Sequence, residues 1–133
     1  KVMTGTVCTS SHHNPELHSI SNEAEVWVGD VVDWVCEYRL YIIKHGVVAC
    51  AIYAGDESVT LDSDVINNAL KAMKQYDWHD TYTMDWGVIR QPDGSLKTAL
   101  VEVNDAWAIG AYKGIGYRDY FQLLKRRWGQ LTQ

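Results

Sequence analysis

The chain has 133 residues, 47% of them hydrophobic, and a net charge of −5 at pH 7. This length and composition fit one soluble globular domain, and the acidic balance argues against a general nucleic-acid binder, which normally carries a basic surface. No apolar run approaches the ~20 residues that a membrane span needs, and the three cysteines show no CxxC spacing, so we expect a cytoplasmic protein.

The first half of the chain predicts a loop followed by a β-hairpin. Residues 8–23 are polar and predict a flexible loop. Residues 37–43 and 47–53 are rich in β-branched and aromatic side chains and predict two strands joined by a turn at 44–46. Because both strands are apolar on both sides, we expect the hairpin to be central in a sheet covered on both faces. Cys36 and Cys50 then become small buried hydrophobic residues.

The second half predicts a helix, another hairpin and a terminal helix. In chain order we expect a helix from Asp62 or Ser63 to about Tyr76, strands over 81–89 and 96–104 with a Pro-Asp-Gly turn between them, and a helix over 117–131. Strands, helix, strands, helix is the order of an α+β fold with a largely antiparallel sheet.

The strand that ends at Asn104 carries oxygen-bearing side chains on one face. Because side chains alternate along a strand, Leu100, Glu102 and Asn104 point the same way. A turn centred on Asp93-Gly94 places Asp85 directly across from Glu102. Two paired carboxylates repel each other unless a cation or proton intervenes, and Mg²⁺ prefers oxygen ligands. The pattern predicts a metal site; the alternative is a set of polar side chains meeting solvent at a strand end.

Arg39 lies in an apolar strand and needs an anionic partner, because a buried unpaired charge is costly. Two kinds of partner are open. Glu37, which shares the face of Arg39, or another carboxylate would form a structural ion pair. A phosphate or a substrate carboxylate would make Arg39 a binding residue.

Several of these residues occur in the pattern of a known family. The run Val101-Glu102-Val103-Asn104-Asp105 follows an Asp85-bearing strand and a short hairpin, and it precedes Gly110-Ala111-Tyr112, Tyr120 and Trp128. This pattern resembles the C-terminal part of the ATP-grasp domain, in a clade from bacteria and phages. The segments Lys1 to Gly5 and Val31 to Arg39 also resemble parts of that clade. The likeness covers nearly the whole chain and is weakest over residues 8–23.

The resemblance implies an ATP-dependent ligase that joins a small-molecule carboxylate to an amine or thiol through an acyl-phosphate. Asp85, Glu102 and Asn104 would hold Mg²⁺ at the ATP phosphates, and the catalytic side chains would be Arg39 and Lys1. The nucleotide base would lie against a hinge near the start of the first strand. Its cofactor-binding residues would be Val32, Asp33, Trp34, Val35 and Glu37.

Two other functions are open. ATP-grasp enzymes clamp ATP between two lobes, so we expect that an N-terminal lobe, a partner protein or a second copy completes the clamp. The chain could instead be a non-catalytic half-domain that binds a partner protein. The third function is a carbohydrate-binding module, but most tryptophans lie beside apolar residues in predicted elements, so we expect them in the core. The tryptophans are Trp27, Trp34, Trp78, Trp86, Trp107 and Trp128.

Overall fold

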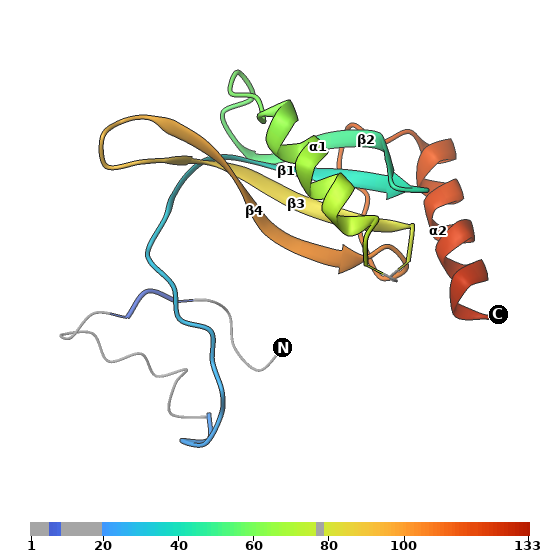
Figure 1. Ribbon diagram of the computed structural model, residues 1–133, viewed down its shortest axis with the longest axis horizontal. Coiled ribbons are helices and arrows are strands. Elements are labelled where there is room, and N and C mark those ends of the chain that lie inside the picture. The colour runs from blue at the N-terminus through green and yellow to red at the C-terminus, as the bar shows by residue number, and fades with distance from the viewer. Residues whose placement is uncertain (1–5, 9–19, 77–78) are drawn as a thin grey trace. The chain divides into compact units, whose positions relative to one another are not determined.

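The computed structural model describes residues 6–8, 20–76 and 79–133. The chain divides into two units, residues 1–32 and residues 33–133. The described residues of the first unit contain no helix or strand, and all the elements belong to the second unit (Figure 1). None of the helices in the described ranges is both long and apolar enough to cross a membrane.

The second unit is a four-stranded antiparallel sheet with two helices, which confirms the predicted α+β fold. Its elements are β1 (Asp33–Ile43), β2 (Gly46–Gly55), α1 (Ser63–Met73), β3 (Tyr82–Arg90), β4 (Leu96–Asp105) and α2 (Tyr117–Leu131). The strand order is β2-β1-β3-β4. The prediction of a central hairpin is therefore right for β1 and wrong for β2, which is an edge strand. The helix α1 also ends three residues earlier than predicted.

Local sequence explains how these elements begin and turn. Lys44 and His45 both adopt positive φ, 53° and 59°. Two such residues form a tight turn whose twist matches that of a β-hairpin. Asp62 caps α1, because its carboxylate accepts hydrogen bonds from the backbone of Asp64 and Val65.

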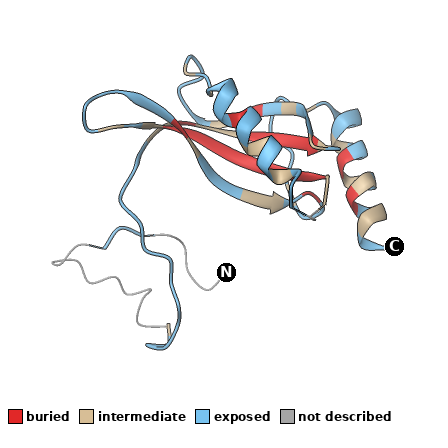
Figure 2. Ribbon diagram, in the orientation of Figure 1, coloured by how far each residue is buried: buried red, intermediate tan, exposed pale blue. Residues whose placement is uncertain are grey.

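Two apolar clusters bury the two faces of the sheet. One lies beneath α1 and contains Leu40, Ile42, Ile66, Tyr82, Met84 and Trp86. The other lies on the opposite face, where Leu123 of α2 packs with Tyr41, Ala51 and Ala106. Burial is accordingly concentrated on β1 and β3, the two central strands (Figure 2).

The expected burial of the tryptophans is only partly correct. Trp86 is buried, whereas Trp27 is fully exposed and Trp107 and Trp128 are about half exposed, at 44% and 50%. Trp78 lies outside the described residues. Cys36 is buried as predicted, but Cys50 is exposed, because it belongs to the edge strand β2.

Ion pairs fasten α2 to the strand ends. Arg127 donates to Asp105 at the end of β4, with 2.9 Å between Nε and Oδ2. Arg126 forms an ion pair with Asp80, just before β3, and Thr81 and Gln130 also donate to that carboxylate. The hydrogen bonds from Arg126, above all, lower the pKa of Asp80 to about 2.

The low pKa of Asp80 makes part of the stability depend on pH. A carboxyl group whose pKa falls from 3.8 to about 2 on folding stabilises the fold above pH ~4, and this contribution disappears as the pH falls toward 2. We expect Asp80→Asn to lower the free energy of unfolding by about 1 kcal/mol at pH 7, because partial exposure weakens the pair. Urea unfolding should show the difference from wild type shrinking between pH 4 and pH 2. An equal difference at both pH values would contradict this assignment.

Candidate functional site

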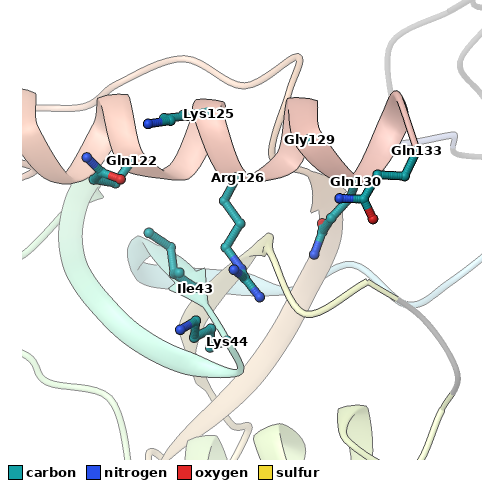
Figure 3. Close-up of a pocket in the computed structure, with 8 residues that line it drawn as sticks. All are labelled: Ile43, Lys44, Gln122, Lys125, Arg126, Gly129, Gln130 and Gln133. Atoms are coloured by element: carbon teal, nitrogen blue, oxygen red, sulfur yellow. The ribbon is translucent and has the colours of Figure 1, made fainter.

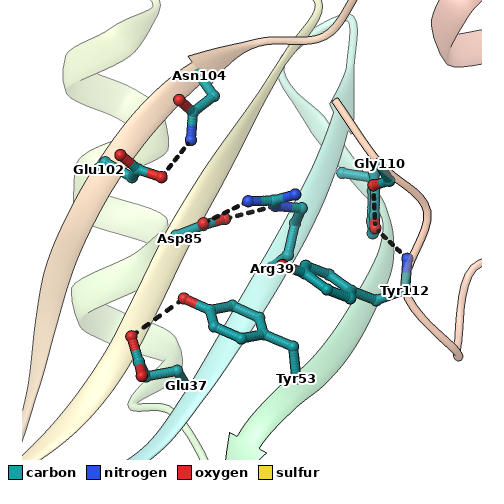
Figure 4. A network of polar contacts seen from close by, with 9 residues as sticks. Glu37, Arg39, Tyr53, Asp85, Glu102, Asn104, Gly110 and Tyr112 are labelled. Carbon is teal, nitrogen blue, oxygen red and sulfur yellow. Dashed lines mark hydrogen bonds and ion pairs between the residues drawn. The ribbon is translucent and has the colours of Figure 1, made fainter. Parts of the chain in front are cut away.

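Three charged side chains form a row across the middle of the sheet. The register pairs Arg39 of β1 with Asp85 of β3, and Asp85 with Glu102 of β4, which confirms the predicted pairing of the two carboxylates. Directly paired residues share a face. Because Leu40 and Met84, their neighbours along the strands, lie in the cluster under α1, the row points away from that helix (Figure 4).

The guanidinium of Arg39 and the carboxylate of Asp85 form a bidentate ion pair. The Nε–Oδ1 distance is 2.7 Å and the Nη2–Oδ2 distance is 2.6 Å. The two residues are 7% and 2% exposed. These hydrogen bonds raise the pKa of Arg39 above its ordinary value. Of the partners that the sequence left open, the structure shows a carboxylate, while Glu37 accepts instead from the hydroxyl of Tyr53 at 3.1 Å.

Two tyrosine rings cover the guanidinium of Arg39. The ring centroid of Tyr112 is 4.8 Å from Cζ of Arg39, that of Tyr53 is 6.0 Å away, and the two rings stack on each other. Tyr41 holds the covering segment in place: its hydroxyl accepts from the backbone of Tyr112 at 2.9 Å and donates to the carbonyl of Gly110 at 3.1 Å. Burial, together with the charges of Asp85 and Glu37, raises the pKa of the Tyr53 hydroxyl.

Glu102 and Asn104 offer oxygen atoms at the open end of the row. The side-chain amide of Asn104 donates to Oε1 of Glu102 at 2.9 Å. Within the described part of the chain, Oε2 of Glu102 and Oδ1 of Asn104 make no hydrogen bond. Thr83, paired with Asn104, is fully buried, and its hydroxyl has no partner among the described residues.

The donor set fits a hard cation such as Mg²⁺, which prefers carboxylate and carboxamide oxygens. Glu102 and Asn104 can supply one unengaged oxygen each, whereas both oxygens of Asp85 are engaged by Arg39. Over the described ranges, no three side chains of the His, Cys, Asp and Glu types gather into a metal-binding group. The predicted set of Asp85, Glu102 and Asn104 is thus brought together, with only two members free to bind.

Irregular pairing shapes this face of the sheet. The register shifts by one residue at Val35, at Tyr53 and at Val101, so each strand that carries an extra residue is bulged there. Bulges re-aim side chains and occur often beside functional sites. The bulge at Tyr53 places its ring over Arg39, and the bulge at Val101 precedes Glu102 directly.

The predicted hinge begins at the edge of the second unit. Val32 belongs to the first unit, and the residues from Asp33 to Val35 start β1. The ring of Trp34 lies over Gly87, where a Cβ atom would stand 2.3 Å from it. Since Gly87 pairs with Glu37, Trp34 and Glu37 are neighbours on the face that carries Arg39.

The roles of the hinge residues remain predictions. The carbonyl of Val35 already accepts from the backbone of Asp56 at 3.0 Å, and Asp33 forms an exposed ion pair with Arg90. Lys1, the second predicted catalytic residue, lies outside the described residues.

A cavity of about 580 Å³ lies beside α2, apart from this row (Figure 3). It contains none of the predicted site residues, and Arg126, which points into it, is paired with Asp80. The cavity therefore does not belong to the candidate site. Its lining consists of Ile43, Lys44, Gln122, Lys125, Arg126, Gly129, Gln130 and Gln133.

A comparison with known protein families matches residues 1–123 to a family of the ATP-grasp domain, the second family of its clade. The chain belongs to this family. The match confirms the resemblance seen in the sequence, and an ATP-grasp domain implies ATP binding and ligase-type chemistry. It contains the whole row from Arg39 to Glu102, with Asn104, and ends within α2. Comparisons with curated proteins and with solved structures gave no significant match.

The sequence missed two side chains of this ATP-grasp face. Tyr53 and Tyr41 lie in predicted strands, but nothing in their spacing distinguished them from core residues. Tyr112 was part of the motif that pointed to the family, without a role. The signal that could have found them is the need of a buried Arg39 for neighbours that tolerate its charge, which aromatic rings do.

Proposed function

We propose that this chain is the Mg-ATP-binding part of an ATP-dependent ligase that joins a carboxylate to an amine or thiol through an acyl-phosphate. The observation that carries the proposal is the row of Arg39, Asp85 and Glu102, with Asn104 beside it, on the face of an ATP-grasp sheet that α1 leaves open. A fixed cation and free oxygen ligands side by side suit a polyphosphate and its metal.

Each residue has a distinct task in this reaction. Glu102 and Asn104 hold Mg²⁺, which neutralises phosphate charge when it is bound. Arg39 binds an oxygen of the transferred phosphate or of the substrate carboxylate. The substrate carboxylate attacks the γ-phosphate, ADP leaves, and the amine or thiol then displaces phosphate from the acyl-phosphate. Trp34 and Glu37 border the adenine and ribose at the start of β1.

Thermal unfolding with and without Mg-ATP tests the proposal. At a hundredfold excess over Kd, a ligand that binds only the folded state adds about 2.7 kcal/mol of stability, so the melting temperature should rise. We expect Glu102→Gln to abolish most of this rise, because it removes the charged ligand. The matched control is Glu57→Gln, an exposed carboxylate in the β2–α1 connection, which should respond like wild type. A wild-type chain whose melting temperature ignores Mg-ATP would contradict the proposal.

One observation supports the second function, a non-catalytic half-domain that binds a partner protein. Tyr117, Phe121, Trp128 and Leu131 recur at helical spacing along α2 and are 86%, 60%, 50% and 47% exposed. Trp107 packs on Trp128 with 4.6 Å between ring centroids and extends this stripe. Contiguous exposed apolar surface marks interaction sites. The thermal experiment separates the two functions, because only the first requires a response to Mg-ATP.

A further inference from the structure

Asp85 lies between a cation and a second carboxylate in the middle of the sheet. Both of its oxygens accept short hydrogen bonds from Arg39, and only 2% of the residue is exposed. A metal ion could use Asp85 only if two charge-assisted hydrogen bonds of a buried pair were broken, and such bonds are among the strongest in proteins. The structure thus opposes the role that the sequence pattern gave to this residue.

The electrostatic reason for a metal at Asp85 is also met without one. Paired carboxylates such as Asp85 and Glu102 repel each other unless a cation lies close. Arg39 is that cation, and it faces Asp85 from the other side. Glu102, in contrast, is exposed and has only the neutral amide of Asn104 as its partner. The uncompensated negative charge of the row therefore resides on Glu102.

We propose that Asp85 is a positioning residue for Arg39, and that the protein's metal ligands are Glu102 and Asn104 alone. This inference rests on the proposed function. Asp85 takes the Nε and Nη2 groups of Arg39, so Nη1 remains to bind an anion. The rings of Tyr53 and Tyr112 restrict the guanidinium from the side. Asp85 thereby fixes which edge of Arg39 meets the phosphate or the substrate carboxylate.

Nuclear magnetic resonance of the arginine Nε–H groups tests the pairing directly in the full chain. We expect one slowly exchanging Nε–H signal from Arg39, which is lost in Asp85→Asn and kept in Glu102→Gln. The signal should persist when Mg²⁺ and ATP are added, because Asp85 keeps its partner. Disappearance of the signal on addition of Mg²⁺ and ATP would show that Asp85 changes partners, and would overturn the inference.

Binding of Mn²⁺, followed by electron paramagnetic resonance, tests the ligand assignment. Glu102→Gln should weaken Mn²⁺ binding at least about tenfold, since even residues that only support a metal ligand are typically worth 10–100-fold. The double variant Arg39→Met/Asp85→Leu keeps the net charge and fills the site with apolar side chains, a replacement that folded proteins often accept. It should bind Mn²⁺ within about threefold of wild type, while its affinity for Mg-ATP falls about tenfold or more, as for a charged hydrogen bond of 1.5–3 kcal/mol.

The two proposals fail in different ways. If the double variant loses Mn²⁺ binding as fully as Glu102→Gln does, Asp85 is a ligand and this inference is wrong, while the proposed function stands. If the wild-type chain binds neither Mn²⁺ nor Mg-ATP, the proposed function falls, and the assignment of Glu102 and Asn104 falls with it.

Discussion

Asp85→Ala is expected to lower the free energy of unfolding by about 3–5 kcal/mol, the usual cost of removing one partner from a buried ion pair. The variant leaves the guanidinium of Arg39 buried between β2 and β3 without its carboxylate. Urea unfolding at neutral pH measures the loss. With a typical domain stability of 5–15 kcal/mol, such a loss would lower the melting temperature markedly.

A matched ion pair on the same sheet provides the control. Asp33 and Arg90 also face each other across β1 and β3, but their side chains are 69% and 52% exposed and the atoms are 3.4 Å apart. Asp33→Ala should therefore cost less than about 1 kcal/mol. The variant Arg39→Met/Asp85→Leu should be more stable than Asp85→Ala. Equal losses for Asp85→Ala and Asp33→Ala would mean that burial does not govern the strength of the Arg39–Asp85 pair.

Gly55→Ala is expected to lower the free energy of unfolding by about 2–5 kcal/mol. Gly55 has φ of +82°, a conformation that costs an alanine roughly 1–2 kcal/mol. Its Cβ would also stand 2.2 Å from the carbonyl oxygen of Val35 and 2.6 Å from Cα of Cys36. Those are backbone atoms of a central strand, so the strand itself must move, and overpacking typically costs about 1–3 kcal/mol more. Chemical denaturation of both proteins gives the difference.

Gly94 separates the two causes. It has nearly the same φ, +85°, but its surroundings are open. Gly94→Ala should therefore lose only the conformational part, roughly 1–2 kcal/mol. If both variants lose the same amount, the contact with Val35 is not a constraint on β1.

The sequence predicted the pairing of Asp85 with Glu102 correctly, but the structure reaches it by another route. A turn centred on Asp93-Gly94 would pair Arg90 with Lys97, whereas Arg90 pairs with Leu96. The bulge at Val101 then adds one residue to β4 and restores the expected pairing at Asp85. For the same reason Leu100 pairs with Trp86, over the α1 side, and does not share the face of Glu102 as alternation predicted.

Elements with a strong periodic pattern were predictable, and contacts between distant segments were not. The terminal helix was placed at 117–131, as observed, because caps and apolar spacing are local signals. The partner of Arg39 depends on which strand lies beside β1, and that is decided by the packing of the whole sheet. Bulges also break the period of two on which any face assignment rests, so the position of Tyr53 over Arg39 could not be read from spacing.

The bulge at Leu100 and Val101 acts as a buffer for chain length over evolutionary time. Both residues lie opposite Trp86, so the loss of either one would give regular pairing and still leave Glu102 across from Asp85. The distance in residues from the Pro-Asp-Gly turn to the Glu102–Asn104 pair can thus change by one without turning these side chains to the other face. Relatives are therefore best aligned on the carboxylate pair itself, and not by counting from the turn.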